Sequence, residues 1–310
     1  MNILVTGGAG YLGSILCEIL LDKGYKVTAI DNLMYRQKSL FHLCNNPKFD
    51  FVFGDVRDKS LMSRLIKNVD VLIPLAAIVG TSACDSDPYL ATTTNVDSIK
   101  LLNKLRSKNQ LVVFPMTNNG YGTPTGGNFC TEETPLKPIT LYGKTKTDAE
   151  KELLASKNAI TLRLASVFGM SSRLRLDLLV NHFVYVALTD GYLVLFEKNF
   201  KRNFIHIHDV ADCFIYCIEN HKKMIGKAYN LGLDSENLSK EELAGKIKQH
   251  LPKFYIDFAD ISSDPDKRNY IVSSQRLKIA GFEAKRSLDE GIKELIKGYQ
   301  FIRRSEFKNI

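Results

Sequence analysis

Tyr142 and Lys146 have the types and spacing of a proton-transfer pair. A spacing of four residues places two side chains on the same face of a helix. A nearby ammonium lowers the pKa of a phenol, so a tyrosine beside a lysine can take a proton from an alcohol near neutral pH. The pattern indicates general base chemistry at an alcohol, and the alternative is an exposed helical pair without a catalytic role.

Three glycines near the N-terminus, Gly7, Gly10 and Gly13, lie between an apolar run and a pattern of helical periodicity. Glycines at a strand-to-helix turn free the backbone dihedrals and let a phosphate approach the main chain, where the helix N-terminus offers free N–H groups. In this context the G-x-x-G-x-x-G spacing predicts a dinucleotide site, whereas a glycine turn without a ligand is the alternative. Asp31 ends the next predicted strand, eighteen residues after Gly13. An acid there suits the ribose hydroxyls of NAD and would repel the 2′-phosphate of NADP, so we expect NAD.

Two later segments fit the same site. Asp55 and Val56 follow the third predicted strand, and that carboxylate could meet the adenine amino group, although a loop or N-cap acid is the alternative for Asp55. The small side chains of residues 75–77, after the fourth strand, would let the backbone lie near the cofactor.

The positive charge of an oxidised nicotinamide would lower the pKa of Tyr142 further, in addition to the effect of Lys146.

Strands and helices alternate through the first half of the chain. This alternation of short apolar strands with helices predicts an α/β fold with a doubly wound parallel sheet of the Rossmann type, followed by a smaller mixed α/β domain. We expect an NAD-binding domain at 1–165 and a substrate-binding domain at 166–310, partly interleaved with the first. The helices expected from periodicity include 88–105, 139–155, 175–189 and 288–307, and Ser239 with Glu242 predicts a capped helix over 239–250.

Composition narrows the class of protein further. The 310 residues are 45% hydrophobic and 25% charged, which excludes a disordered chain, and a net charge of +8 suits an anionic small molecule as readily as nucleic acid. No nucleic-acid motif is present, and no Cys or His cluster has zinc-ligand spacing, so we expect neither nucleic-acid binding nor a metal site. Without a signal peptide or an apolar stretch of membrane-spanning length, and with six cysteines in no disulfide-like pattern, we expect a cytoplasmic protein.

These motifs together resemble the extended short-chain dehydrogenase/reductase family, and the resemblance covers nearly the whole chain. Residues 6–13 match the cofactor loop of the family, and Asp31-Asn32, Asp55-Val56 and 75–77 match its next three cofactor contacts. The resemblance implies that the cofactor is contacted by Gly7, Gly10, Tyr11, Leu12, Asp31, Asn32, Asp55, Val56, Leu75, Ala76, Ala77, Asn95, Tyr142 and Lys146. In the family, the asparagine matched by Asn95 supports the active-site helix.

Thr117 stands where the family places its catalytic serine or threonine, four residues before Tyr121 and twenty-five before Tyr142. The resemblance implies that Thr117 hydrogen-bonds the substrate hydroxyl, that Tyr142 is the base and that Lys146 tunes it. Related 4,6-dehydratases read Thr-Asp-Glu here, whereas this chain reads Thr117-Asn118-Asn119, and asparagine cannot transfer the protons that removal of water requires. The chain also lacks the glutamate of UDP-glucuronate decarboxylases and the cysteine of GDP-fucose synthases at Asn119.

The remaining reactions need only hydride transfer and one proton. The closest resemblance is to GDP-heptose 4-dehydrogenases of bacterial capsule biosynthesis, which share the Thr-Asn-x-Gly-Tyr-Gly loop, the Pro-Leu-Ala-Ala segment and the Arg-x-Arg-x-Asp-Leu-Leu-Val-Asn stretch. A sugar 4-epimerase is the alternative, although Pro74 and Ser166 differ from the residues usual in 4-epimerases. A non-catalytic NAD-sensing protein is a third reading, against which the intact Thr117, Tyr142 and Lys146 argue.

A nucleotide diphosphate needs cations, and the second half supplies arginines in family-like contexts. The resemblance implies substrate contacts at Asn119, Arg173, Asn181, Arg202 and Arg268. By the resemblance, Arg202 and Arg268 bind the substrate phosphates, since two guanidinium groups suit a diphosphate, and the alternative for each is a surface ion pair. The family also implies a homodimer, formed by a four-helix bundle of the helices at 88–105 and 139–155.

Overall fold

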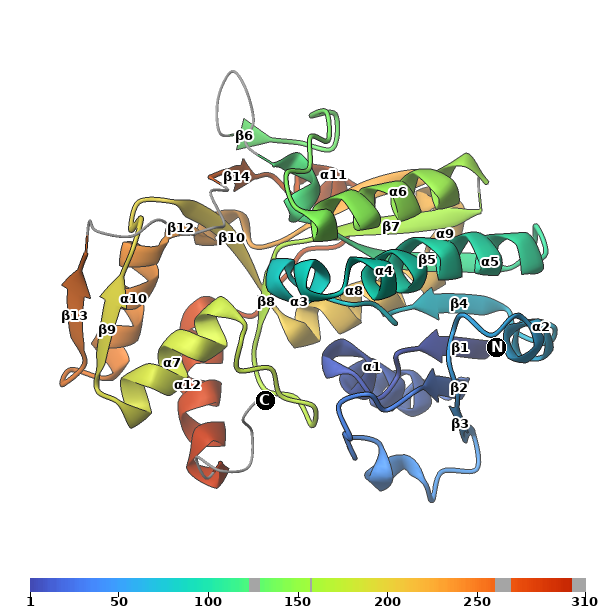
Figure 1. The fold of residues 1–310 in the computed structure, drawn as a ribbon, viewed down its shortest axis with the longest axis horizontal. Coiled ribbons are helices and arrows are strands. Elements are labelled where there is room, and N and C mark those ends of the chain that lie inside the picture. The colour runs from blue at the N-terminus through green and yellow to red at the C-terminus, as the bar shows by residue number, and fades with distance from the viewer. Residues whose placement is uncertain (123–128, 157, 260–268, 303–310) are drawn as a thin grey trace.

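A seven-stranded sheet forms the centre of the computed structural model, which describes residues 1–122, 129–156, 158–259 and 269–302. All neighbouring strands in it are parallel, and their order is β11-β7-β5-β4-β1-β2-β3 (Figure 1). The strands are β1 (Asn2–Thr6), β2 (Lys26–Asp31), β3 (Phe49–Phe53), β4 (Val71–Pro74), β5 (Leu111–Thr117), β7 (Ala159–Leu164) and β11 (Lys227–Leu231). This order, with its reversal beside β1, confirms the predicted doubly wound α/β fold.

Helices cover both faces of this sheet because alternate strand residues are apolar and buried on opposite sides. Ile3 and Val5 pack in one core with helices from residues 11–22 and 207–219, and Leu4 between them packs in a second core with helices from residues 59–66, 98–105 and 141–155. The helices are α1 (Tyr11–Asp22), α2 (Lys59–Ile66), α3 (Thr81–Ser86), α4 (Pro88–Thr92), α5 (Ser98–Leu105), α6 (Leu141–Ala155), α7 (Leu179–Thr189), α8 (Ile207–Glu219), α9 (His221–Met224), α10 (Lys240–His250), α11 (Gln275–Ala280) and α12 (Leu288–Gly298).

A smaller lobe lies to the left of the large sheet in Figure 1. It contains α7, α10 and α12, which enclose a core of their own around residues such as Phe183, Phe204 and Leu295. Its strands form short sheets: β8 (Ser166–Phe168), β10 (Lys201–His206) and β12 (Asn237–Ser239) in one, and β9 (Tyr192–Leu195) with β13 (Tyr255–Phe258) in another. A third short sheet pairs β6 (Phe129–Cys130) with β14 (Ile271–Val272). The chain crosses between the lobes more than once, because β11 and α8 belong to the large sheet and its cover.

Several expected helices differ in their bounds. The helix expected over 88–105 is continuous but contains a π turn at Thr93–Asp97 between α4 and α5. The helix expected from Arg175 begins only at Leu179, because Arg175 and Asp177 pair with each other in the preceding loop and Leu178 is extended. The last expected helix ends at Gly298, and a 3₁₀ turn follows over Tyr299–Phe301. Ser239 caps α10 with the predicted capping box.

Within the described residues, no helix has the length and apolar character needed to cross a membrane. All six cysteines are free thiols, and five of them are buried.

A buried ion pair joins α6 to β7. The guanidinium of Arg163 lies 2.9 Å from the carboxylate of Glu150, and both side chains are less than one-tenth exposed. Thr161 Oγ1 also donates to Glu150 at 2.7 Å, and Arg163 donates to the hydroxyl of Tyr121 at 3.0 Å. The pair therefore fixes α6 against the sheet through charge-assisted hydrogen bonds.

Replacing Arg163 with methionine is expected to lower the free energy of unfolding by about 3–5 kcal/mol, because it leaves the Glu150 carboxylate buried without its partner. Urea denaturation followed by circular dichroism measures this change. Lys151→Ala is the control, since its pair with Asp148 is exposed and should contribute less than about 1 kcal/mol. Equal effects of the two substitutions would contradict the stabilising role of the buried pair.

Candidate active site

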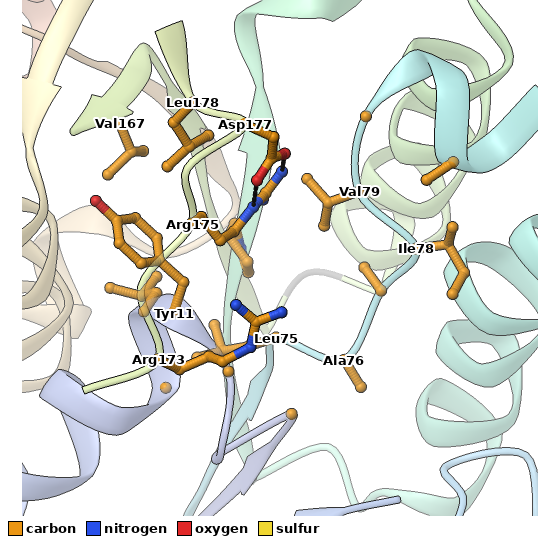
Figure 2. Close-up of a pocket in the computed structure, with 18 of the residues that line it drawn as sticks. Tyr11, Leu75, Ala76, Ile78, Val79, Val167, Arg173, Arg175, Asp177 and Leu178 are labelled. Atoms are coloured by element: carbon orange, nitrogen blue, oxygen red, sulfur yellow. Dashed lines mark hydrogen bonds and ion pairs between the residues drawn. The ribbon is translucent and has the colours of Figure 1, made fainter. Parts of the chain in front are cut away.

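A cavity of 1710 Å³ opens between the carboxyl ends of the parallel strands and the smaller lobe (Figure 2). Such a position, at the point where the strand order reverses, is where open parallel sheets bind ligands. Its lining contains most of the residues expected from the sequence: Gly7, Gly10, Tyr11, Leu12, Asp31, Asn32, Asp55, Val56, Leu75, Ala76, Ala77, Thr117, Asn119, Tyr142, Lys146, Arg173 and Arg202. The structure thus brings together segments separated by nearly two hundred residues.

Three expected residues are placed differently. Asn95 is buried in the wall, where its side chain hydrogen-bonds both the N–H and the carbonyl of Ile78 and Thr145 Oγ1. Asn181 is fully buried and donates to the carbonyl of Arg175 at 3.0 Å, so its amide organises the loop before α7 and does not face the cavity. Arg268 lies outside the described residues.

The turn after β1 requires its glycines for reasons of space. Gly7 has φ = +68°, and a Cβ there would lie 2.6 Å from the backbone nitrogen of Ala76. A Cβ on Gly13 would lie 2.4 Å from the carbonyl oxygen of Gly7. The turn therefore packs closely against its neighbours and leaves its outer side to a ligand, with α1 beginning at Tyr11.

Asp31 stands at the end of β2, beside this turn. Its carboxylate accepts hydrogen bonds from the N–H of Leu33 at 2.8 Å, the N–H of Ala9 at 3.1 Å and the side chain of Gln37 at 3.1 Å. Burial raises the pKa of Asp31, and these hydrogen bonds together with the charge of Arg173 act against the rise. The carboxylate is thus fixed at the mouth of the glycine turn, where the ribose hydroxyls of a dinucleotide would lie.

Asp55 is paired within its own loop. Arg57 donates to both of its carboxylate oxygens, at 2.9 and 2.7 Å, and these hydrogen bonds lower the pKa of Asp55. Both carboxylate oxygens of Asp55 can accept further hydrogen bonds, so the amino group of an adenine could still donate to them. The segment over residues 75–77 is held by Thr6, whose Oγ1 accepts a hydrogen bond from the N–H of Ala76 at 3.2 Å.

Thr117, Tyr142 and Lys146 all line this cavity. Thr117 ends β5, and its Oγ1 accepts from the N–H of Asn119 at 3.2 Å, which leaves the hydroxyl proton for another partner. Tyr142 and Lys146 lie in the first part of α6, whose start is capped by Thr140. The three side chains come from two elements that pack against each other.

Lys146 is almost completely buried, with only 4% of its surface exposed. Its ammonium lies 3.9 Å from the centroid of the Phe114 ring. Burial lowers the pKa of Lys146 to about 7, and the carboxylate of Glu150, one helical turn further on, acts in the opposite direction. The charge of Lys146 is therefore poised near neutral pH, as suits a group that tunes a proton-transfer partner.

Arg175 and Asp177 line the cavity but were not among the residues expected from the sequence. Arg175 Nε donates to Asp177 Oδ1 at 3.1 Å, and Figure 2 shows the pair projecting from the loop before α7. This pairing lowers the pKa of Asp177 against the effect of burial. Tyr142 is among the groups whose charge raises the pKa of Arg175. The signal that could have found them is the Arg-x-Arg-x-Asp stretch that contains both Arg175 and Asp177, which was used only for the family resemblance.

The comparisons with known proteins agree with this arrangement. A sequence profile of the NAD dependent epimerase/dehydratase family matches residues 3–232. The chain belongs to this family.

Among relatives of the family, an uncharacterized UDP-glucose epimerase, YtcB, of Bacillus subtilis is 31% identical over 80% of this chain and 79% of its own length. The low-salt glycan biosynthesis protein Agl12 of Haloferax volcanii is 27% identical over 96% of this chain and 98% of its own. A crystal structure of dTDP-glucose 4,6-dehydratase from Bacillus anthracis in complex with NAD has a TM-score of 0.83, with 26% identity over 97% of this chain and 96% of that one.

The chain is accordingly an NAD-dependent enzyme of the nucleotide-sugar epimerase and dehydratase class. The described residues fit NAD, because the glycine turn has no room for Cβ atoms on its inner side and Asp31 stands beside it. When bound, NAD supplies the hydride acceptor, and Tyr142 and Lys146 lie in the same cavity as the glycine turn.

The low pKa of Lys146 predicts a pH-dependent stability of the cofactor-free protein. Between pH 7 and about 10.5, the unfolded chain carries more protons than the folded chain, so this residue makes the free energy of unfolding rise with pH. Lys146→Met removes the penalty of charging a buried amine and should therefore stabilise the protein more at pH 7 than at pH 10. Urea denaturation at the two pH values measures the difference.

Lys144→Met is the matched control, since Lys144 is an exposed lysine on the same helix. It should leave the pH dependence of stability unchanged. A Lys146→Met variant with the same effect at pH 7 and pH 10 would show that the lysine is not perturbed.

Proposed function

We propose that this enzyme oxidises a ring hydroxyl of a nucleotide-activated sugar to a keto group, at C-4 of a GDP-heptose or a similar sugar. The observation that carries the proposal is the composition of the reacting end of the cavity. Thr117, Tyr142 and Lys146 are among its residues. In the loop before α7, Asp177 is the only carboxylate that lines the described cavity, and Arg175 holds it ionised. The other lining acids, Asp31 and Asp55, belong to the dinucleotide end.

In this proposal the reaction needs one base and one hydride acceptor. The oxygen of Tyr142 takes the proton of the sugar hydroxyl, and the Thr117 hydroxyl donates a hydrogen bond to the same sugar oxygen. The hydride leaves the ring carbon for the nicotinamide, and a carbonyl forms. Lys146 stabilises the tyrosinate through its positive charge, which its near-neutral pKa makes sensitive to pH.

Dehydration is disfavoured by the two residues after Thr117. Asn118 is buried, with 2% of its surface exposed, and does not line the cavity. Asn119 lines the cavity but carries an amide, which neither gives nor takes a proton near neutral pH. A keto-sugar formed here would therefore lose no water and would keep the hydroxyl groups on the carbons next to the carbonyl.

The volume of the cavity supports two ligands. Sites for one drug-sized ligand measure about 300–1,000 Å³, whereas this cavity measures 1710 Å³. Arg202, 5% exposed, lines the cavity 5.8 Å from the Tyr270 ring and offers a guanidinium for the substrate diphosphate. The choice of a GDP-heptose rests on the shared loop segments described above, whereas the name of the Bacillus subtilis relative concerns UDP-glucose.

A nucleotide-sugar 4-epimerase, which returns the hydride to the opposite face of a transient 4-keto sugar, is the second candidate. The relative that is 31% identical favours it, since its name describes a UDP-glucose epimerase. Both reactions use the same base and the same first step, so the fate of the hydride distinguishes them.

The deciding experiment incubates the enzyme with stoichiometric NAD and a panel of GDP-, UDP-, ADP- and CDP-sugars. Absorbance at 340 nm follows NADH, and mass spectrometry identifies the sugar product. NADH formed in step with a product two mass units lighter supports the dehydrogenase. An isomeric product of unchanged mass without net NADH would establish the epimerase, and a product lighter by one water would overturn both.

Tyr142→Phe should lower the rate of hydride transfer by about 10²- to 10⁴-fold, because it removes the hydroxyl that acts as the base and keeps the aromatic ring that fills the site. Single-turnover absorbance at 340 nm measures the rate, and calorimetric titration with NAD should give a dissociation constant close to that of the wild type. Lys144→Met serves as the neutral control on the same helix. Undiminished hydride transfer in Tyr142→Phe would refute the assignment of the base.

We also propose that two copies associate through α4, α5 and α6, as the family resemblance implies. α5 and α6 pack against each other, and Tyr89 on α4 is 76% exposed. Sedimentation of wild type and Tyr89→Asp would test the assembly, which should weaken in the variant.

A role of this enzyme in capsule polysaccharide synthesis follows only if a GDP-heptose is the substrate.

A further inference from the structure

The loop over residues 169–178, which leads into the smaller lobe, is attached to the first turn of α1. The Tyr11 hydroxyl donates to the carbonyl of Gly169 at 2.7 Å, and Ser171 Oγ donates to the carbonyl of Tyr11 at 2.7 Å. Ser171 Oγ also lies 2.9 Å from Ser14 Oγ. Because α1 begins at the glycine turn, these bonds fix the loop beside the dinucleotide half of the cavity.

Arg173 follows directly after this attachment. Its backbone N–H donates to Ser171 Oγ at 3.2 Å, and its guanidinium lies 5.0 Å from the centroid of the Tyr35 ring, in the loop after β2. The charge of Arg173 also acts on Asp31. In Figure 2 the side chain extends across the cavity toward Leu75 and Ala76. Tyr35 and Asp31 belong to the dinucleotide half, whereas the guanidinium also donates to the carbonyl of Leu174 and is affected by the charges of Arg175 and Asp177 in its own loop.

Arg202 has a different environment, although the sequence grouped the two arginines together. It lies on β10, close to the Tyr270 ring, and donates to the carbonyl of Lys201. Arg175 is also distinct, because Asp177 already pairs with it. Of the two described arginines predicted from the sequence to hold the substrate, Arg173 is thus the one that has neighbours beside the glycine turn, in Tyr35 and Asp31.

The chemistry of this position suits a pyrophosphate. The start of α1 has no acidic residue in its first turn, so its N–H groups face an anion without competition from its own side chains. A guanidinium placed opposite them presents a planar fork of donors that matches phosphate oxygens. The pyrophosphate of NAD would then lie between the helix N-terminus of one lobe and an arginine of the other.

We propose that Arg173 binds the pyrophosphate of NAD from the side of the smaller lobe and does not bind the substrate. Ser171, which is bonded to both Tyr11 and Arg173, positions it. Because this contact holds the bound cofactor, its loss should speed the release of the cofactor.

The test is the affinity of cofactor-free enzyme for NAD, measured by calorimetry, and the dissociation rate of NADH, followed by its fluorescence. Arg173→Ala should weaken NAD binding by about 10- to 100-fold, since it removes a charge-assisted contact, and should speed release. ADP-ribose should lose the same factor, and adenosine, which lacks the pyrophosphate, should lose none. Arg173→Lys should recover part of the affinity, and Ser171→Ala should fall between wild type and Arg173→Ala.

Arg202→Ala is the matched control, in which NAD affinity should stay within about twofold of the wild type. Arg64→Ala, on the exposed side of α2, controls for the loss of one positive charge. Thermal melting of each cofactor-free variant checks folding, and Arg173→Gln, which retains the side-chain stem, replaces Arg173→Ala if the latter does not fold.

Unchanged NAD affinity in Arg173→Ala with a raised KM for the nucleotide sugar would overturn the proposal and return Arg173 to the substrate. An equal loss for adenosine and NAD would also overturn it, because the contact would then not involve the pyrophosphate. NAD binding needs no sugar, so these outcomes are independent of which sugar the enzyme oxidises and of whether it epimerises it.

Discussion

The absence of a side chain at Gly7 is the constraint on which the rest of the site depends. The backbone of this turn lies so close to the segment after β4 that a Cβ would come within 2.6 Å of the Ala76 nitrogen. The close approach lets β1 and β4 pair as neighbours and brings the start of α1 to the edge of the sheet. A larger residue at this position would push the ends of β1 and β4 apart and change the shape of the dinucleotide-binding surface.

The second determinant is the burial of charge around α6. Lys146 and Glu150 follow Tyr142 at intervals of one helical turn, and each is almost completely enclosed. Glu150 is neutralised by Arg163 on β7, whereas Lys146 faces the Phe114 ring and the cavity. Burial therefore has opposite consequences along one helix face, because the paired charge anchors the helix and the unpaired amine acquires a pKa near neutrality.

The two lobes share the site through the loop over 169–178. Hydrogen bonds from this loop to Tyr11 tie the substrate side of the cavity to the cofactor side. Asn181, at the start of α7, supports the same loop from behind. The position of Arg173 and Arg175, which this loop carries into the cavity lining, thus depends on how the loop is attached to α1.

The sequence alone determined the alternation of strands and helices, the glycine turn, Asp31, and the pair of Tyr142 and Lys146, because each depends on local spacing and residue type. It also indicated from Asn118 and Asn119 that no acid follows Thr117. The tertiary structure decided what depends on distant contacts: β11 as an edge strand of the large sheet, the extended loop before α7, and the burial of Asn95 and Asn181 within the wall. It also decided what surrounds each arginine, because the loop that carries Arg173 is held by a hydrogen bond between Ser171 and Tyr11, 160 residues apart, which no local pattern records.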